Sequence, residues 1–297
     1  MKDLSRLKEK SNNARISGRP LLLDGAVGSL LINRLGVPKS RVWASEFNDS
    51  NPEEVIRLHR DYIDAGADII TTNTFRTNPA AREQGSDISA TVNKIKSGVL
   101  LAKEAAGNKE VLIAGSNAPA EDCYQIERTL TSAQLEKNHQ LHISKLIESG
   151  ADFILNETQG HFDEIKIITG FCSREYIPYA VSLFCTEDLN LLSGEPVQEA
   201  IDYLNDYSPL FVSFNCITFK HLSRLIADCK LPESWGCYLN CGSGKVTDII
   251  LKCGIAPEDY SRQIKSVLKY KPSVVGACCG SGPSHIKALK EMLENNH

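Results

Sequence analysis

Three cysteines, Cys216, Cys278 and Cys279, stand at the ends of two short β-rich segments and are the residues in this sequence best suited to chemistry. Two adjacent thiolates from one strand end and a third from another strand can converge on a single ion. Zinc binds cysteine sulfur at about 2.3 Å, and three protein ligands leave its fourth tetrahedral position open for a substrate. The pattern therefore predicts one catalytic Zn²⁺ per chain. Simple packing of the three cysteines, or an oxidised Cys278–Cys279 pair, is the alternative.

The residues around Cys278 and Cys279 favour a binding loop. The stretch from residue 274 to 286 reads VVGACCGSGPSHI, in which small residues let the backbone turn sharply. Pro283 suits the first turn of a following helix. The isolated cysteines lack such surroundings, and we interpret them as small buried hydrophobic residues: Cys123, Cys172, Cys185, Cys229, Cys237 and Cys253.

The scaffold must bring distant strand ends together, and the element pattern indicates one that does. Eight β-rich runs occur at residues 20–24, 68–73, 110–117, 151–157, 179–184, 210–216, 236–240 and 273–279. Helix-like segments occur at residues 51–65, 132–149, 163–173, 195–205, 219–228, 257–270 and 283–295. This alternation is typical of parallel sheets with crossover helices.

Eight such units without a linker predict an α/β fold, a single (β/α)8 barrel over residues 20–297, after a polar segment at residues 1–19. An open doubly wound sheet is the alternative, but its Gly-x-Gly-x-x-Gly sequence does not follow the first strand. Barrels place catalytic groups at the C-terminal ends of their strands. Polar residues stand at those ends beside the cysteines, although helix capping is a simpler role for several of them: Asp24, Asn73, Thr74, Asn117, Glu157, Thr158, Asn215 and Asn240.

In their order and spacing these motifs resemble the homocysteine S-methyltransferase family, a group of zinc-dependent barrel enzymes. The resemblance covers nearly the whole chain. The motifs that carry it are residues 24–29 (DGAVGS), 72–75 (TNTF), 157–158 (ET) with Glu164, 215–216 (NC), 240–242 (NCG), and 278–279 (CC) ahead of 283–286 (PSHI).

The resemblance implies that Cys216, Cys278 and Cys279 bind Zn²⁺ and that the thiolate of homocysteine becomes the fourth ligand. It also implies that Glu157 and Asp24 are catalytic-site residues that hold the amino-acid substrate. A coordinated thiol loses its proton, so the bound sulfur is a nucleophile at neutral pH.

The remaining substrate contacts are implied by the same resemblance. Backbone N–H groups of the turn that includes Ala26 and Val27 would receive the substrate carboxylate, because helix N-termini favour anions. Asn240, Asn73 and Thr74 would complete the pocket.

The chain departs from the family pattern at several places. Ala277 stands where a second glycine is usual, Leu239 and Cys241 flank Asn240 where proline and a small residue are common, and residues 115–119 (GSNAP) lack the usual glycine-proline-rich loop. These departures concern the donor side and the shape of the pocket. Cys241 is expected near the site without being a ligand.

The methyl donor is expected to be a small sulfonium compound, S-methylmethionine or S-adenosylmethionine, because no cobalamin-binding module follows the last predicted helix. A betaine-type donor, a related thiol acceptor, and a zinc-retaining thiol-binding protein without catalysis are the alternatives. A zinc hydrolase fits less well, since such sites usually use histidine and carboxylate ligands.

Composition excludes several other classes of protein. A net charge of −4 and a pI of about 6.0 provide no broad positive field for nucleic acid. No apolar run approaches the roughly 20 residues of a spanning helix, and residues 1–19 do not form a signal peptide. Ten cysteines without a secretion signal indicate a reducing, cytoplasmic location.

Two further motifs are weaker. Residues 242–245 (GSGK) look like part of a phosphate-binding loop, but a P-loop needs glycine where Leu239 stands and Ser or Thr in place of Val246. His139 and His142 share one face of a predicted helix, where a third metal ligand is missing.

Overall fold

The computed structural model describes residues 10, 18–38, 42–81, 87–244, 248 and 250–295. Most of the polar segment predicted at residues 1–19 lies outside them, as do Lys245 and Val246 of the glycine-rich motif. The assignment of residues 20–297 to one domain stays a prediction. None of the helices in the described ranges is both long and apolar enough to cross a membrane.

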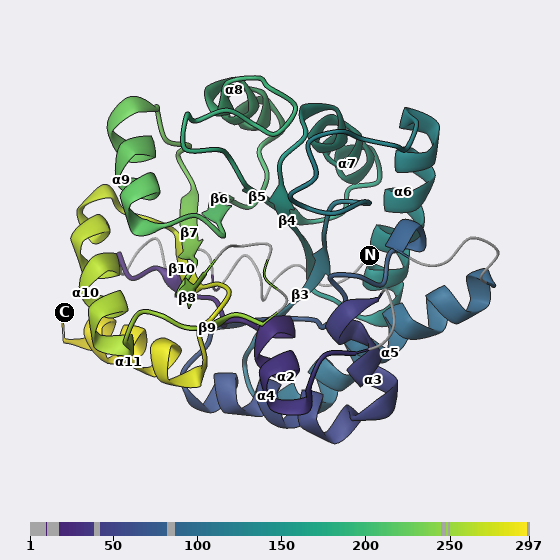
Figure 1. The fold of residues 1–297 in the computed structure, drawn as a ribbon, viewed down its shortest axis with the longest axis horizontal. Coiled ribbons are helices and arrows are strands. Elements are labelled where there is room, and N and C mark those ends of the chain that lie inside the picture. The colour runs from purple at the N-terminus through teal and green to yellow at the C-terminus, as the bar shows by residue number, and fades with distance from the viewer. Residues whose placement is uncertain are drawn as a thin grey trace.

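Eight parallel strands within the described residues form one sheet in the order β1-β10-β7-β6-β5-β4-β3-β2. Leu23 pairs with Ile69, which brings β1 beside β2 and closes the sheet into a barrel (Figure 1). The predicted (β/α)8 fold is thus confirmed. The strands are β1 (Leu21–Leu22), β2 (Ile69–Thr71), β3 (Leu112–Asn117), β4 (Phe153–Gln159), β5 (Tyr179–Leu183), β6 (Val212–Asn215), β7 (Trp235–Leu239) and β10 (Val274–Ala277).

Helices surround the barrel, and their ends carry clear sequence signals. Thr131 and Gln134 form a capping box, and the Thr218 hydroxyl accepts a hydrogen bond from His221 N. The helices are α2 (Gly28–Leu35), α3 (Phe47–Ser50), α4 (Pro52–Asp64), α5 (Ile88–Ala106), α6 (Ser132–Ser149), α7 (Phe162–Arg174), α8 (Val197–Tyr207), α9 (Phe219–Asp228), α10 (Pro257–Val267) and α11 (Pro283–Glu294), with 3₁₀ turns η1 (Trp43–Glu46), η2 (Pro79–Ala81) and η3 (Leu268–Tyr270).

Several elements were not among the predicted segments, including the short helix α3 and the turns η1 and η2. Helices α2 and α5 follow β1 and β2, and α5 begins where the side chain of Asp87 accepts a hydrogen bond from Ser89 N. A two-stranded antiparallel hairpin, β8 (Gly242–Ser243) with β9 (Lys252–Cys253), follows β7. The hairpin lies at the C-terminal end of the barrel, where it extends the wall beside the cysteine loop (Figure 1).

The barrel interior is apolar in its lower part, toward the N-terminal ends of the strands, and more polar in its upper part, toward their C-terminal ends. Side chains alternate across each strand, so every second residue points inward. The lower interior cluster is almost entirely apolar and comprises Leu23, Ile69, Leu112, Ala114, Phe153, Leu155, Ala180, Phe211, Tyr238 and Val274. Nearer the C-terminal ends of the strands lie mostly polar residues, which form what we call the upper polar layer: Thr71, Ser116, Glu157, Ser182, Asn215 and Cys278.

Candidate metal and substrate site

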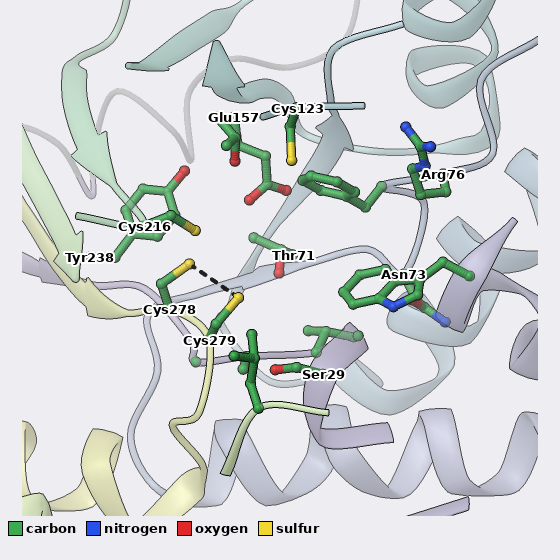
Figure 2. Close-up of a pocket in the computed structure, with 18 of the residues that line it drawn as sticks. Ser29, Thr71, Asn73, Arg76, Cys123, Glu157, Cys216, Tyr238, Cys278 and Cys279 are labelled. Carbon is green, nitrogen blue, oxygen red and sulfur yellow. Dashed lines mark hydrogen bonds between the residues drawn. The ribbon is translucent and has the colours of Figure 1, made fainter. Parts of the chain in front are cut away.

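A cavity of about 410 Å³ lies directly above the lower interior cluster, at the C-terminal ends of the strands. Its walls include the three cysteines, Glu157 and Asp24. Figure 2 shows the three cysteine sulfurs on one side of this cavity, pointing toward one another. The barrel has therefore brought together residues that are up to 255 positions apart in the sequence.

The three sulfurs form the one group in the described part of the chain with metal-ligand geometry. The Sγ atoms of Cys216, Cys278 and Cys279 all lie within 4.8 Å of one another. Cys278 Sγ and Cys279 Sγ are 3.9 Å apart, so both are free thiols rather than a disulfide. Cys216 follows β6 directly, and the cysteine pair follows β10.

The backbone at Cys216 is held in an unusual conformation. Its φ is +57°, in the left-handed region, and Thr158 across the site has a φ of +59°. Asn215 braces both residues: its Oδ1 accepts from Thr158 N at 3.1 Å, and its Nδ2 lies 2.8 Å from Thr158 Oγ1 and 3.4 Å from Cys216 Sγ. Such conformations are costly and tend to persist where they serve a site.

The protons of the three thiols are strongly coupled, which fits a site built for a cation. Hydrogen bonds from Cys216 and Cys278 hold the pKa of Cys279 well below its usual range. The hydrogen bonds that Cys278 makes with Cys216 and Cys279 raise its own pKa well above the usual range. A divalent cation bound by the three sulfurs would stabilise the thiolate form of each.

Glu157 points into the same cavity from the end of β4. The hydroxyl of Ser116 donates a hydrogen bond to Glu157 Oε1, and Ser116 N donates in turn to Thr72 Oγ1 at 3.0 Å. Burial raises the pKa of Glu157 to about 7, with a smaller contribution from the charge of Cys216, while the Ser116 hydrogen bond lowers it. Because Glu157 lines the cavity, its carboxylate can also contact a cationic ligand there.

Asp24 is the second carboxyl group of the site and is only 1% exposed. Its side chain accepts hydrogen bonds from Thr71 N at 2.8 Å and from Thr71 Oγ1 at 3.1 Å. Burial raises the pKa of Asp24 well above its usual range, although the Thr71 hydrogen bonds act in the opposite direction. A cation placed between Asp24 and Glu157 would relieve this cost of burying charge.

The turn between β1 and α2 is packed too tightly for any side chain at Gly25. A Cβ there would lie 2.7 Å from Ser281 Oγ and 2.9 Å from the Tyr62 ring. Ala26 N donates to Ser281 Oγ at 3.0 Å, so this amide already has a partner. The cap residue Val27 makes no side-chain hydrogen bond to the helix, which leaves the first amides of α2 beside the cavity.

The structure places the remaining predicted residues in three ways. Asn73 lines the cavity, but its amide Nδ2 lies 2.9 Å from both Ala44 O and Asn48 Oδ1 and so braces η1 and α3. Thr74 is buried behind the wall, where its hydroxyl donates to Ser116 O. Asn240 is not among the cavity-lining residues, and its Oδ1 accepts from Gly242 N at 2.8 Å in the turn before β8.

Several wall residues were not predicted from the sequence. Tyr238 comes from β7, and its inward position follows from strand alternation once the end of β7 is known. Trp43 and Phe75 form an edge-to-face pair with ring centroids 5.9 Å apart. Cys123 and Tyr124 belong to the β3–α6 loop, and no local pattern in that loop signals that it reaches the cavity.

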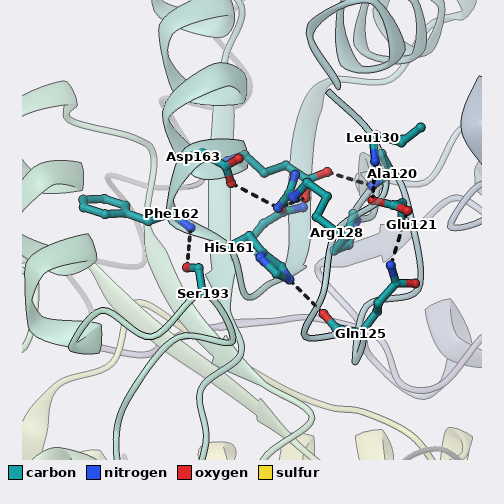
Figure 3. Close-up of polar contacts among 12 residues, drawn as sticks. Ala120, Glu121, Gln125, Arg128, Leu130, His161, Phe162, Asp163 and Ser193 are labelled. Atoms are coloured by element: carbon teal, nitrogen blue, oxygen red, sulfur yellow. Dashed lines mark hydrogen bonds and ion pairs between the residues drawn. The ribbon is translucent and has the colours of Figure 1, made fainter. Parts of the chain in front are cut away.

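The β3–α6 loop is fastened to the start of α7, as Figure 3 shows. Arg128 Nη2 lies 3.1 Å from both Asp163 Oδ1 and Glu164 Oε2. The imidazole of His161 bonds to Gln125 O at 2.8 Å. These contacts hold the loop as a preformed wall of the cavity.

His139 and His142 belong to the buried support of this loop. His139 Nε2 lies 2.6 Å from Glu164 Oε1, and His142 bonds through its two ring nitrogens to Thr77 Oγ1 and Asn117 Oδ1, both at 2.8 Å. Burial lowers the pKa of His142 to about 3. Among the described residues, the one group with metal-ligand geometry does not include either histidine.

Comparison with known proteins agrees with this geometry. The sequence profile of the family described as homocysteine S-methyltransferase matches residues 21–293. The homocysteine S-methyltransferase of Escherichia coli (strain K12) is 25% identical over 291 residues, which cover 91% of this chain and 94% of that protein. The betaine-homocysteine S-methyltransferase of Drosophila melanogaster is 24% identical over 304 residues, covering 85% and 87%.

The fold is shared with a solved relative. The metallated form of the homocysteine methyltransferase MmuM from Escherichia coli matches with a TM-score of 0.77 at 24% identity, over 95% of this chain and 99% of that chain. The profile match spans all eight strands of the barrel and all three cysteines of the cluster. The chain therefore belongs to the homocysteine S-methyltransferase family.

Proposed function

We propose that this protein transfers a methyl group from a small sulfonium donor to the thiolate of homocysteine, which gives methionine. The observation that carries the proposal is the convergence of three thiols in one cavity with two carboxyl groups. The thiols fit a zinc ion and the carboxyl groups fit the ammonium of an amino acid. One cavity thus offers both ends of homocysteine a partner.

Cys216, Cys278 and Cys279 would hold the zinc ion, because three thiolates suit a catalytic site with one open position. When bound, the ion lowers the pKa of an acceptor thiol and keeps its sulfur anionic at neutral pH. Asn215 fixes the direction of Cys216 through its contact with Sγ. The residues around the cluster therefore orient the ligands and exclude bulk water.

Glu157 and Asp24 would hold the acceptor ammonium, and the first amides of α2 would receive its carboxylate. Both contacts lie at the C-terminal ends of the strands, beside the thiols. With the acceptor fixed at both ends, its sulfur meets the donor methyl group in one orientation, and such positioning is a large part of catalysis in group transfer.

A cationic donor suits the aromatic part of the cavity lining. Trp43 and Phe75 present aromatic surfaces to the cavity, and aromatic faces attract sulfonium and ammonium cations. The methyl carbon forms a bond to the acceptor sulfur while its bond to the donor sulfur breaks, and the bonding electrons leave with a neutral thioether. With S-methylmethionine, each turnover gives two molecules of methionine.

Two alternatives remain open to experiment. A betaine-type donor is also a methylated cation, and the name of the Drosophila relative includes betaine. A thiol-binding protein without catalysis would keep the metal and the acceptor pocket but would not transfer the methyl group. A zinc hydrolase is less compatible with three cysteine ligands.

Turnover decides among these functions. Zinc-loaded protein is incubated with homocysteine and, in separate reactions, S-methylmethionine, S-adenosylmethionine and glycine betaine, without cobalamin, and methionine is measured by mass spectrometry. We expect methionine with a sulfonium donor. Methionine from betaine alone would replace the donor assignment, and no methionine with any donor, despite homocysteine binding, would leave the thiol-binding function.

A further inference from the structure

Tyr238 lines the candidate site with a hydroxyl that has no hydrogen-bond partner among the described residues. It lies near the end of β7, between the strand that carries Cys216 and the strand that carries Cys278. Its ring packs in the lower interior cluster with Phe211 and Val274. The residue is only 3% exposed and yet lines the cavity, where Figure 2 draws it beside Cys216.

The hydroxyl of Tyr238 is a buried polar group without a hydrogen-bond partner among the described residues. Burial raises the pKa of this hydroxyl well above its usual range, and the negative charge of Glu157 raises it further. The hydroxyl therefore stays protonated at neutral pH. A buried hydroxyl left unpaired costs free energy, and its neighbourhood commonly explains why it is kept. Here that neighbourhood includes the Glu157 carboxylate.

Ser182 is the hydroxyl that can serve as an acceptor for the Tyr238 proton. Ser182 lies close enough to lower the pKa of Tyr238, and its own proton is donated to Asn215 Oδ1 at 2.7 Å. The Ser182 oxygen is therefore left with lone pairs that can receive the Tyr238 proton after a small shift. A Tyr238 hydroxyl that donates to Ser182 would keep its own lone pairs for a ligand with N–H groups in the cavity that Tyr238 lines.

We propose that the Tyr238 oxygen accepts a hydrogen bond from the ammonium group of the acceptor, beside Glu157, and so selects α-amino thiols over simple thiols. The inference rests on the proposed function and adds a specificity-determining residue to it. An ammonium group carries three N–H donors. Glu157 and Asp24 can receive two of them, and Tyr238 supplies an acceptor for the third.

The test is binding without turnover, in the presence of a non-thiol reductant. Zinc-loaded wild-type protein and Tyr238→Phe are titrated by calorimetry with L-homocysteine and with 4-mercaptobutanoate, which is homocysteine without its amino group. We expect Tyr238→Phe to weaken homocysteine binding about tenfold or more, the usual effect of losing a hydrogen bond to a charged group. Binding of 4-mercaptobutanoate should change less than about twofold, because it has no N–H groups to lose a partner. Zinc content and Tm should not fall.

Tyr260→Phe is the matched control. Tyr260 is also a fully buried tyrosine, but its hydroxyl accepts from Leu239 N at 3.0 Å and donates to Gly276 O at 2.6 Å. This variant should lower Tm and leave the ratio of the two affinities unchanged.

Three outcomes would overturn the inference. Equal losses for both acceptors in Tyr238→Phe would place the hydroxyl at the sulfur or the metal, and no loss for either would make it a bystander. A fall in Tm with unchanged affinities would give it a structural role. Failure of the wild-type protein to bind homocysteine at all would instead reject the proposed function, and this inference with it.

Discussion

The lower interior cluster and the upper polar layer occupy the same barrel and come from the same strands, yet they differ completely in chemistry. Phe153 and Leu155 on β4 face apolar neighbours, whereas Glu157, the next inward residue, faces the cavity. A single step of two residues along the strand thus separates packing from chemistry. The comparison teaches that stability and function in this fold can be altered independently, by residues on one strand.

The largest expected effect is at the metal. Cys278→Ser or Cys279→Ser should abolish stoichiometric zinc binding and activity, because two sulfurs cannot complete the site. The free energy of unfolding of the metal-free protein should change little, since the substitution leaves the apolar side chains of the lower interior cluster in place. Metal analysis and urea unfolding measure the two quantities. Cys237→Ser, a buried cysteine outside the cluster, is the control that should keep its zinc. Stoichiometric zinc in a Cys278→Ser, Cys279→Ser double variant would contradict the assignment.

In the lower interior cluster we expect a substitution to reduce stability and to leave zinc binding intact. Phe153→Ala removes a fully buried ring whose centroid lies 6.2 Å from that of Phe211. It should lower the free energy of unfolding by about 3–5 kcal/mol, the usual cost for such a cavity. Zinc content measured under native conditions should remain at one per chain. If Phe153→Ala lost its zinc while still folded, the two layers would not be independent.

The third effect lies within the upper layer. Glu157→Ala leaves the acceptor ammonium without its charged partner, which should cost about 2–5 kcal/mol in kcat/KM for homocysteine. Zinc content should be unchanged, because Glu157 is not one of the three sulfur ligands. An amine-free thiol acceptor should show little of the loss in steady-state assays. Equal losses with both acceptors would mean that Glu157 supports the fold or the metal instead.

The smallest effect concerns the helical layer outside the barrel. His59 on α4 is fully buried, and neither of its ring nitrogens has a hydrogen-bond partner among the described residues. Burial lowers the pKa of His59 from 6.5 to about 4. Between these values the unfolded chain binds more protons than the folded one, so stability is fully present above pH 6.5 and is lost as the pH falls toward 4. At pH 5 the loss from His59 is about 2 kcal/mol.

His59→Leu measures that contribution. Its free energy of unfolding should fall less between pH 7.5 and pH 5 than that of the wild-type protein, by the same about 2 kcal/mol. Zinc-linked changes are common to both proteins and cancel in the difference. An identical pH dependence in variant and wild type would show that His59 does not titrate as its burial indicates.

The elements with local signals were predicted well. Helix α6 begins at the Thr131–Gln134 capping box and spans the predicted residues 132–149, and α9 likewise spans 219–228. The sequence also indicated the three cysteines, because adjacent thiols beside glycines at a strand end are rare in simple packing. In these places the neighbouring residue types were sufficient to predict the element or the candidate site.

The rest depended on contacts between distant segments. Nothing near Tyr124 in the sequence shows that its loop crosses the cavity, since ion pairs from Arg128 to α7 fix that path. Thr74 and Asn240 stand at strand ends as predicted, but neighbouring backbone atoms turn their side chains into bracing roles. Whether either contacts the substrate stays a prediction.

The hydrogen bond from Ala26 N to Ser281 Oγ joins positions 255 apart, next to the turn that would hold the substrate and the loop that would hold the metal. Two of the three ligand sulfurs belong to that same late loop. A ribosome-bound chain therefore has most of its barrel wall long before it has a binding site. A chain that ends before the last strand would lack two of the three sulfurs that we propose as zinc ligands. The candidate site is therefore complete only after the last strand has been synthesised and has closed the barrel.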